Sequence, residues 1–149
     1  MPSVTTSTFR DFRIELGDGA TPTENFAFIA GLTSKGVNFT TGTETSEVPD
    51  DTDENLPSWQ EKDVVSIGAT ISGSGMWATQ NHAILFNWWR SATPRNVRIR
   101  YFAALTGQPE FYQGPAVLTQ LDHQADKGGR VRGTITIEFT RAPTLTNKP

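Results

Sequence analysis

The sequence contains no cysteine and only two histidines, and these absences exclude several kinds of site. Without cysteine, neither a disulfide framework nor a thiolate metal site can form. His82 and His123 lie far from any serine and acid pattern that would predict a catalytic triad, and no HExxH or nucleophile-elbow motif occurs. We therefore expect no enzyme activity, no cofactor and no metal site.

Long apolar runs are also missing. No stretch approaches the ~18 apolar residues of a membrane-spanning helix, and residues 1–13 lack the apolar centre of a signal peptide. These absences predict a soluble protein that is not exported by that route. The length of 149 residues suits one domain. We expect a single domain over residues 1–149, with flexible ends at about residues 1–8 and 142–149.

The composition favours a mainly β fold. Apolar residues make up 36% of the chain, which also contains 13 glycines, 9 prolines and many threonines. Threonine is enriched in strands, whereas glycine and proline are typical of turns. We expect short strands that are joined by turns.

The stretch from Asp63 to Pro94 carries the longest alternating strand pattern and the only strong helix pattern. From Val64 to Met76, apolar residues and glycines alternate with serines and threonines, as is typical of a half-buried strand. A helix is predicted over about Thr79–Ala92, with Thr79 as its N-cap. Its apolar side chains form one stripe at helical spacing, and this stripe contains Leu85, Trp88, Trp89 and Ala92.

Alternation predicts further strands at about residues 10–16, 26–32, 37–40, 97–103, 111–121 and 130–141. We expect the second and third of these to form a hairpin through Ser34–Gly36. Periodicity disappears from about Gly42 to Gln60, where the chain is polar and acidic. This predicts a long acidic arm without regular structure over about residues 43–60, and Trp59 would anchor it to another surface.

Charge is unevenly distributed although the net charge is only −3. Residues 36–61 contain acids but no lysine or arginine, and residues 64–109 contain arginines but no acid. This segregation is compatible with ordinary solvated surface, or with contacts between neighbouring copies. The candidate arm residues are Glu44, Glu47, Asp50, Asp51, Asp53, Glu54 and Trp59, and the candidate basic contact belt is Arg90, Arg95, Arg98 and Arg100.

Two motifs imitate ligand sites. Gly73, Gly75 and Ala78 have the spacing of a dinucleotide-binding fingerprint, but the preceding strand alternates and no acid follows near position 93. We expect these glycines to allow a bulge or a close approach of backbones instead. Asp51, Asp53 and Asn55 resemble the start of a calcium loop, but Leu56 and Lys62 occupy positions that require glycine and glutamate, which excludes an EF-hand and leaves open only an irregular cation site in this loop.

Three segments together resemble a known family. They are the opening strand FRIELGDG, the region from ENFAFIAGLTSKGVNF through the acidic arm to LPSWQEKD, and the strand VVSIGATISGSGMW that leads into the helix. In order and spacing they are similar to the major tail proteins, or tail tube proteins, of long-tailed bacteriophages and of gene transfer agents. The resemblance covers about residues 9–92 well and the remainder loosely.

The resemblance implies a β-sandwich or half-barrel with one flanking helix and an arm. It also implies a structural virion protein that self-assembles into stacked hexameric rings, made in the bacterial cytoplasm and located in the tail. Its partners would be itself, other tail proteins (tape measure, distal tail and terminator) and double-stranded DNA that passes without tight binding, with no membrane. The candidate lumen-facing residues are Ser66, Thr70, Ser72, Arg132, Thr134, Thr136 and Glu138.

Two alternative functions remain open from the sequence. A tail-completion or neck protein would form a single ring instead of a tube. A carbohydrate-binding β-sandwich would use exposed aromatic residues such as Trp59, Trp77 or Tyr112.

Overall fold

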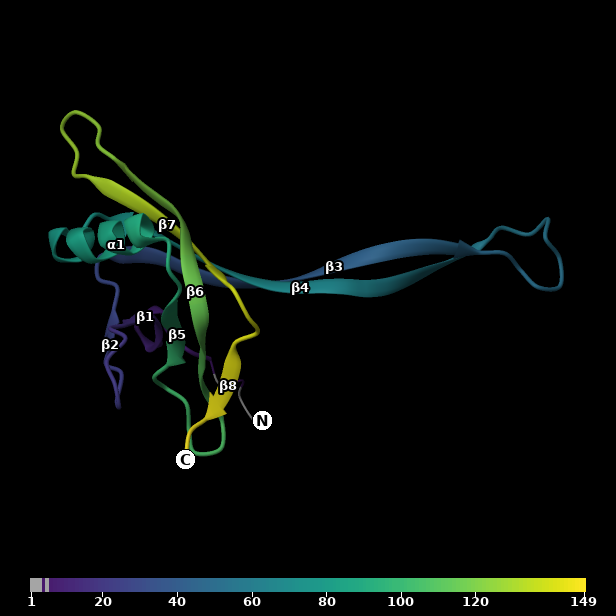
Figure 1. Ribbon diagram of the computed structural model, residues 1–149, viewed down its shortest axis with the longest axis horizontal. Coiled ribbons are helices and arrows are strands. Elements are labelled where there is room, and N and C mark those ends of the chain that lie inside the picture. Colours follow the sequence, from purple (N-terminus) through teal and green to yellow (C-terminus); the bar gives the residue numbers. More distant parts are fainter. Residues whose placement is uncertain (1–3, 5) are drawn as a thin grey trace.

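The structure, a computed structural model, describes residue 4 and residues 6–149. Within these residues, eight antiparallel strands form one sheet in the order β2-β1-β5-β6-β7-β4-β3, and β8 pairs with β6 (Figure 1). The mainly β fold with one flanking helix is therefore confirmed, as one curled sheet. The elements are η1 (Phe9–Asp11), β1 (Phe12–Gly17), β2 (Phe26–Phe28), β3 (Leu32–Val48), β4 (Trp59–Met76), α1 (Thr79–Ser91), β5 (Arg95–Tyr101), β6 (Pro109–Gln124), β7 (Arg132–Phe139) and β8 (Thr144–Asn147).

The hydrophobic core lies on one face of the sheet, where alternate residues of each strand are apolar. Ile14 of β1, Ile99 of β5, Ile137 of β7 and Ile71 of β4 are at most 1% exposed. Burying such a side chain completely contributes roughly 1.5–3 kcal/mol. The side chains on the opposite face of the sheet are therefore free to form a functional surface.

Helix α1 confirms the predicted helix and covers one part of this core. Leu85 and Trp88 are buried, and the Trp88 indole Nε1 donates a hydrogen bond to the Thr93 carbonyl oxygen at 3.0 Å. Trp89, which was predicted on the same stripe, is 51% exposed. The buried stripe is therefore narrower than predicted and leaves aromatic surface on the outer side of the helix.

The ends of α1 differ slightly from the prediction. Ala78 is the N-cap and makes no side-chain cap hydrogen bond, so the prediction that Thr79 caps the helix is wrong by one residue. Instead, the Asn81 side-chain amide donates to the Ala30 carbonyl oxygen at 3.1 Å and ties the first turn to the β2–β3 connection. The helix ends at Ala92 in a left-handed conformation. No helix in residues 4 and 6–149 combines the length and the hydropathy needed to cross a membrane.

Strands β3 and β4 form a long hairpin that projects from the rest of the molecule (Figure 1). Their pairing continues to Val48 opposite Trp59, whereas β7 pairs with β4 only from Thr70 to Met76. We call residues 40–48 and 59–68 the hairpin stem, residues 49–58 the hairpin tip, and the remainder the body. The predicted arm without regular structure over residues 43–60 is therefore wrong at its two ends, residues 43–48 and 59–60, which are strand, and the tip at residues 49–58 lacks strand structure as predicted.

The predicted hairpin through Ser34–Gly36 is also wrong. Those residues lie inside β3, and β2 pairs with β1 instead. A register shift between Leu32 and Ser34 bends β3 at this point. Gly75 of β4 lies opposite, where a Cβ atom would come closer than 3.0 Å to the backbone of Thr33. The expectation of a bulge with close backbone approach at this glycine motif is confirmed.

The sheet curls until β3 reaches β1. The Lys35 ammonium of β3 donates to the carbonyl oxygens of Phe9 and Phe12 and lies 3.9 Å from the centroid of the Phe9 ring. Burial lowers the pKa of Lys35 from its ordinary value. Tyr101 and Tyr112 continue the aromatic packing between these strands. The curl closes the core like a half-barrel.

Short regular elements lie near both ends of the described chain. Residues 144–147 pair with the first part of β6 as strand β8. Near the other end, the Thr8 hydroxyl donates to Asp11 at 2.7 Å and begins η1. Part of the predicted flexible start, residues 1–3 and 5, lies outside the described residues.

Candidate functional site

A polar face covers the sheet opposite the core on strands β4 and β7. Thr70 lies opposite Glu138 and Ser72 opposite Thr136, and directly opposed residues of antiparallel strands share a face. The structure thus brings six of the seven candidate lumen-facing residues together. Ser66 lies further along the same face on the hairpin stem, opposite Gly42 of β3.

The polar face extends onto both neighbouring strands. Asn38 of β3 lies opposite Thr70, and Gln120 of β6 lies opposite Thr136. The one arginine among the candidates, Arg132, donates to Asp126 at 2.7 Å, so its charge has a partner. Small hydroxyl and amide side chains therefore dominate a surface that offers few sites for binding a phosphate backbone.

The hairpin tip has an internally ordered shape. One carboxylate oxygen of Asp50 accepts hydrogen bonds from the Thr52 amide and hydroxyl and from the Asp53 amide, at 2.6–3.0 Å. These bonds lower the pKa of Asp50. Asp53 in turn accepts from the Asn55 amide at 3.0 Å. The side chains of the remaining tip acids, Asp51 and Glu54, accept no hydrogen bond from other described residues.

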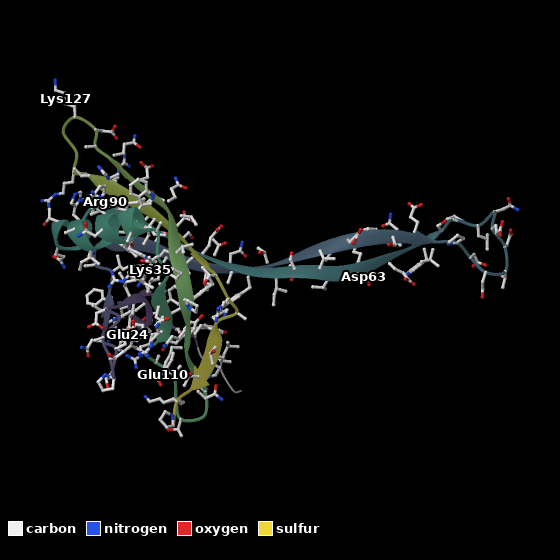
Figure 2. The ribbon with its side chains drawn as sticks, viewed as in Figure 1. Glu24, Lys35, Asp63, Arg90, Glu110 and Lys127 are labelled. Atoms are coloured by element: carbon white, nitrogen blue, oxygen red, sulfur yellow. The ribbon has the colours of Figure 1, made fainter. Side chains whose placement is uncertain are left out.

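The hairpin stem exposes apolar side chains as well as open strand edges. Ile67 is 74% exposed and Trp59 77% exposed, and Phe39 lies at the base of the stem. A groove of about 290 Å³ runs beneath this base, between the stem and residues 139–143 at and after the end of β7. An unpaired strand edge with apolar side chains readily adds another strand or surface. Figure 2 shows Asp63 on the stem, away from the body that carries Arg90.

The structure divides the predicted basic belt. Arg90 lies on α1, and Arg95 donates two hydrogen bonds, at 2.7 and 3.2 Å, to the Gly17 carbonyl oxygen. Arg98 and Arg100 instead lie on the opposite face of β5, next to β1 and β6. Only these last two arginines of the belt share one surface.

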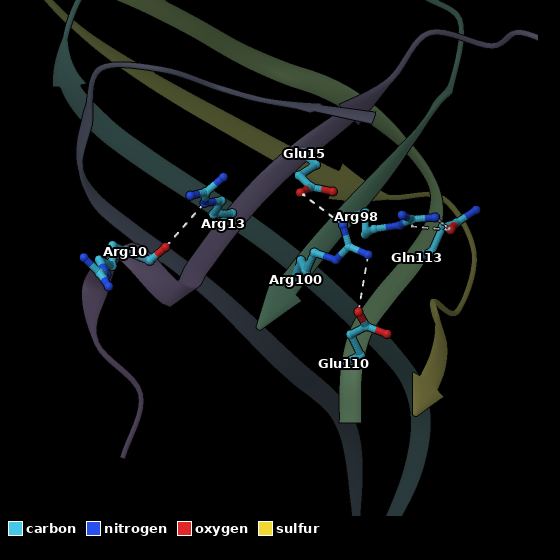
Figure 3. A network of polar contacts seen from close by, with 7 residues as sticks. All are labelled: Arg10, Arg13, Glu15, Arg98, Arg100, Glu110 and Gln113. Carbon is cyan, nitrogen blue, oxygen red and sulfur yellow. Dashed lines mark hydrogen bonds and ion pairs between the residues drawn. The ribbon is translucent and has the colours of Figure 1, made fainter. Parts of the chain in front are cut away.

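Arg98 and Arg100 belong to a larger cluster that the sequence analysis missed (Figure 3). Three guanidinium groups of this cluster are each stacked on two phenylalanine rings, at 3.9–5.8 Å from the ring centroids. Such cation–π contacts hold an arginine in a fixed orientation. We call this cluster the Arg–Phe patch, and its members are Arg13, Arg98, Arg100, Phe26, Phe28, Phe102 and Phe111.

A buried glutamate supports the Arg–Phe patch from below. Glu15 is 5% exposed, and its Oε1 lies 3.8 Å from Arg100 Nη1. Its Oε2 is buried and has no hydrogen-bond partner among the described residues. Burial raises the pKa of Glu15 although the neighbouring arginines act in the opposite direction. Arg100 also pairs with Glu110 at 3.3 Å, whereas among the described residues Arg98 donates only to the neutral Gln113 amide oxygen.

A sequence signal for this patch did exist. Arg13 and Glu15 alternate in one predicted strand as Arg98 and Arg100 do in another, on the side away from the apolar residues. The sequence does not show that β1 pairs with β5. Only this pairing, which places Glu15 opposite Arg98, shows that the charged residues of the two strands form one surface.

The fold defined above is that of tail tubes. The structure is similar to the tail of an empty gene transfer agent particle refined with C6 symmetry, with a TM-score of 0.73 and 20% identity over 95% of this chain and 99% of that chain. It is also similar to the SPP1 tail tube, with a TM-score of 0.65 and 9% identity over 96% and 80% of the two chains. A chain of an extracellular contractile injection system, the PVC sheath-tube complex in its extended state, gives a TM-score of 0.59 and 14% identity over 95% of this chain and 92% of that chain.

The sequence itself matches the family described as phage tail tube protein over residues 6–144. The chain therefore belongs to the phage tail tube protein family, and the resemblance found in the sequence is confirmed. It is a structural protein of the virion tail. No curated protein matches the sequence.

Proposed function

We propose that copies of this chain assemble into hexameric rings, which stack into the tube through which DNA is delivered. The projecting hairpin supports this proposal most directly. Its stem exposes apolar side chains and open edges that nothing in the described chain covers. The six-fold symmetry of the similar gene transfer agent tail supports the ring size. A head-to-tail contact closes into a ring when its rotation permits.

The polar face of β4 and β7 is proposed to line the lumen. Its serines and threonines carry no charge, and its arginine is paired with Asp126. Tight DNA binding needs several lysines or arginines on phosphates. A surface of this composition would let double-stranded DNA pass without holding it. The proposed lumen-facing residues are Ser66, Thr70, Ser72, Arg132, Thr134, Thr136 and Glu138.

The hairpin is proposed to make the contacts between copies. Its acids and Trp59 are exposed or nearly so, and the hairpin points away from its own body (Figure 1). At its ends and in its lumen, the tube would meet the other tail proteins, which are the tape measure, distal tail and terminator proteins. The proposed arm residues are Glu44, Glu47, Asp50, Asp51, Asp53, Glu54 and Trp59.

Electron microscopy of the purified chain tests this function. After concentration, we expect negatively stained tubes whose cross-section has six-fold symmetry. Rings that never stack would instead favour a neck or tail-completion protein. A chain that stays monomeric at every concentration would contradict the proposal.

A further inference from the structure

Two surfaces of opposite charge lie on separate parts of this molecule. The hairpin tip carries Asp50, Asp51, Asp53 and Glu54, and none of these forms an ion pair within the described residues. In the body, the guanidinium groups of the Arg–Phe patch lie on one sheet face. Because the hairpin projects away from the body, the tip of one chain cannot reach its own patch (Figure 1).

Two arginines of the patch have no carboxylate in direct contact with them among the described residues. Glu15 and Glu110 both lie beside Arg100. Arg13 and Arg98 have no carboxylate within ion-pair distance among the described residues. Their stacking on phenylalanine rings fixes the planar groups in advance, which reduces the entropy lost when a carboxylate binds.

The tip has charges and an exposed apolar side chain that complement this patch. Asp50 and Asp53 form the turn through their hydrogen bonds, which leaves Asp51 and Glu54 to make outward contacts. Leu56 is 49% exposed beside them, and Phe28 and Phe102 of the patch are 54% and 44% exposed. The tip is thus an acidic turn with one exposed apolar side chain, and the patch is a basic surface with exposed apolar rings. The two surfaces are therefore complementary.

We propose that the hairpin tip of one copy docks on the Arg–Phe patch of another copy, with Asp51 and Glu54 contacting Arg13 and Arg98. This inference rests on the proposed self-assembly and specifies which surface receives the hairpin. Other exposed basic residues, such as Arg90 on α1 and Lys127 in the β6–β7 turn, lie outside this array of stacked rings. The contact joins two different surfaces, so it can be repeated from copy to copy.

Charge reversal at the tip tests the pairing. Asp51→Lys with Glu54→Lys leaves the turn-forming acids in place, and we expect it to raise the protein concentration needed for tubes by about tenfold, since two charge pairs become repulsive. Glu61→Lys with Asp63→Lys makes the same charge change on the stem and should have a much smaller effect. Adding Arg13→Glu and Arg98→Glu to the tip variant should restore tubes.

Three results would overturn the docking site. They are normal tubes from the tip variant, equal impairment by the tip and stem variants, and no recovery in the four-site variant when its circular dichroism and melting match the wild type. Each of these leaves wild-type tubes, and thus the proposed function, intact. A wild-type chain that never assembles would instead contradict the proposed function itself.

The absence of cysteine allows a second, independent measurement. A chain with Asp51→Cys and Arg13→Cys should form a ladder of disulfide-linked oligomers when its tubes are oxidised. Asp63→Cys with Arg13→Cys places one thiol on the stem and should give no ladder. A ladder from the stem pair but not from the tip pair would contradict the docking site.

Discussion

Glu15 is a buried acid whose carboxylate lies in an environment that disfavours its charged form. One of its oxygens has no hydrogen-bond partner in the part of the chain that the structure describes, and its contact with Arg100 is long, at 3.8 Å. Removing one partner of a buried ion pair is destabilising when the other charge is left buried and unpaired, but Arg100 is partly exposed and would keep Glu110 as its partner. The raised pKa of Glu15 shows that burial outweighs the attraction of the arginines.

This predicts a pH-dependent effect of Glu15→Gln. Because the folded pKa is raised above the ordinary value of 4.5, the stability contributed by protonated Glu15 is complete below that value. It is lost as the pH rises through the folded pKa. The variant should therefore gain stability relative to the wild type between pH 4 and pH 7, as measured by urea unfolding of unassembled protein.

Glu110→Gln is the matched control, since it also removes a carboxylate beside Arg100 but at a more exposed position. A Glu15→Gln variant that is clearly less stable than the wild type at pH 7 would mean that the ion pair with Arg100 outweighs the cost of burial.

Gly75 shows how one missing side chain shapes β3. A Cβ atom there would come closer than 3.0 Å to the backbone of Leu32 and Thr33, whereas at Gly68 the nearest atom, Thr40 Oγ1, is 3.5 Å away. We expect Gly75→Ala to lower the free energy of unfolding by about 1–3 kcal/mol. Gly68→Ala should be neutral or stabilise by up to about 1 kcal/mol. Equal effects of the two substitutions in denaturant unfolding would contradict this account.

At the scale of elements, the body contains the residues that stabilise the fold, whereas the hairpin is the element proposed to make the contacts between copies. The buried core consists of residues from the body, and the stem contributes no buried side chain to it. The stem is held by its strand pairing alone.

We therefore predict that the hairpin can be shortened without unfolding the body. Replacing residues 44–63 by Asn-Gly would join Thr43 to its pairing partner Val64 through a two-residue turn. The melting temperature of the body should change by only a few degrees, roughly the effect of 1 kcal/mol, and tubes should be absent by microscopy. Normal tubes from this variant would show that the hairpin is dispensable.

The elements also show which features a sequence can reveal. Alternation records burial, so the strands around Ile71, Ile99 and Ile137 and the helix around Trp88 were predicted, as was the shared polar side of β4 and β7. Residues 64–68 of the stem belong to the predicted strand, but residues 41–48 and 59–63 could not be predicted as strands, because both of their faces are largely exposed and no apolar period marks them. The Arg–Phe patch depends on the register of β1 against β5, which local patterns do not contain.

At the scale of the whole molecule, charge is sorted between body and hairpin. Acids gather on the projecting tip, and stacked arginines gather on the sheet of the body. The two surfaces are complementary yet separate within one chain, as head-to-tail assembly requires. Assembly should therefore weaken as ionic strength rises, because salt screens exposed charges over about 10 Å at 0.1 M. Light scattering during polymerisation measures this, and tubes that form better in high salt would point to apolar contacts as the main driving force.

The projecting hairpin also determines how a single unassembled copy moves through water. A 16.4 kDa chain with this outline presents far more drag than a sphere of equal mass. It should sediment slowly and elute early from a sizing column, as a small dimer would, although it is one molecule. When the hairpin of one copy docks on another, the excess friction relative to a sphere of the same mass should decrease, so hydrodynamic measurements can follow the first step of tail growth before any tube is long enough to see.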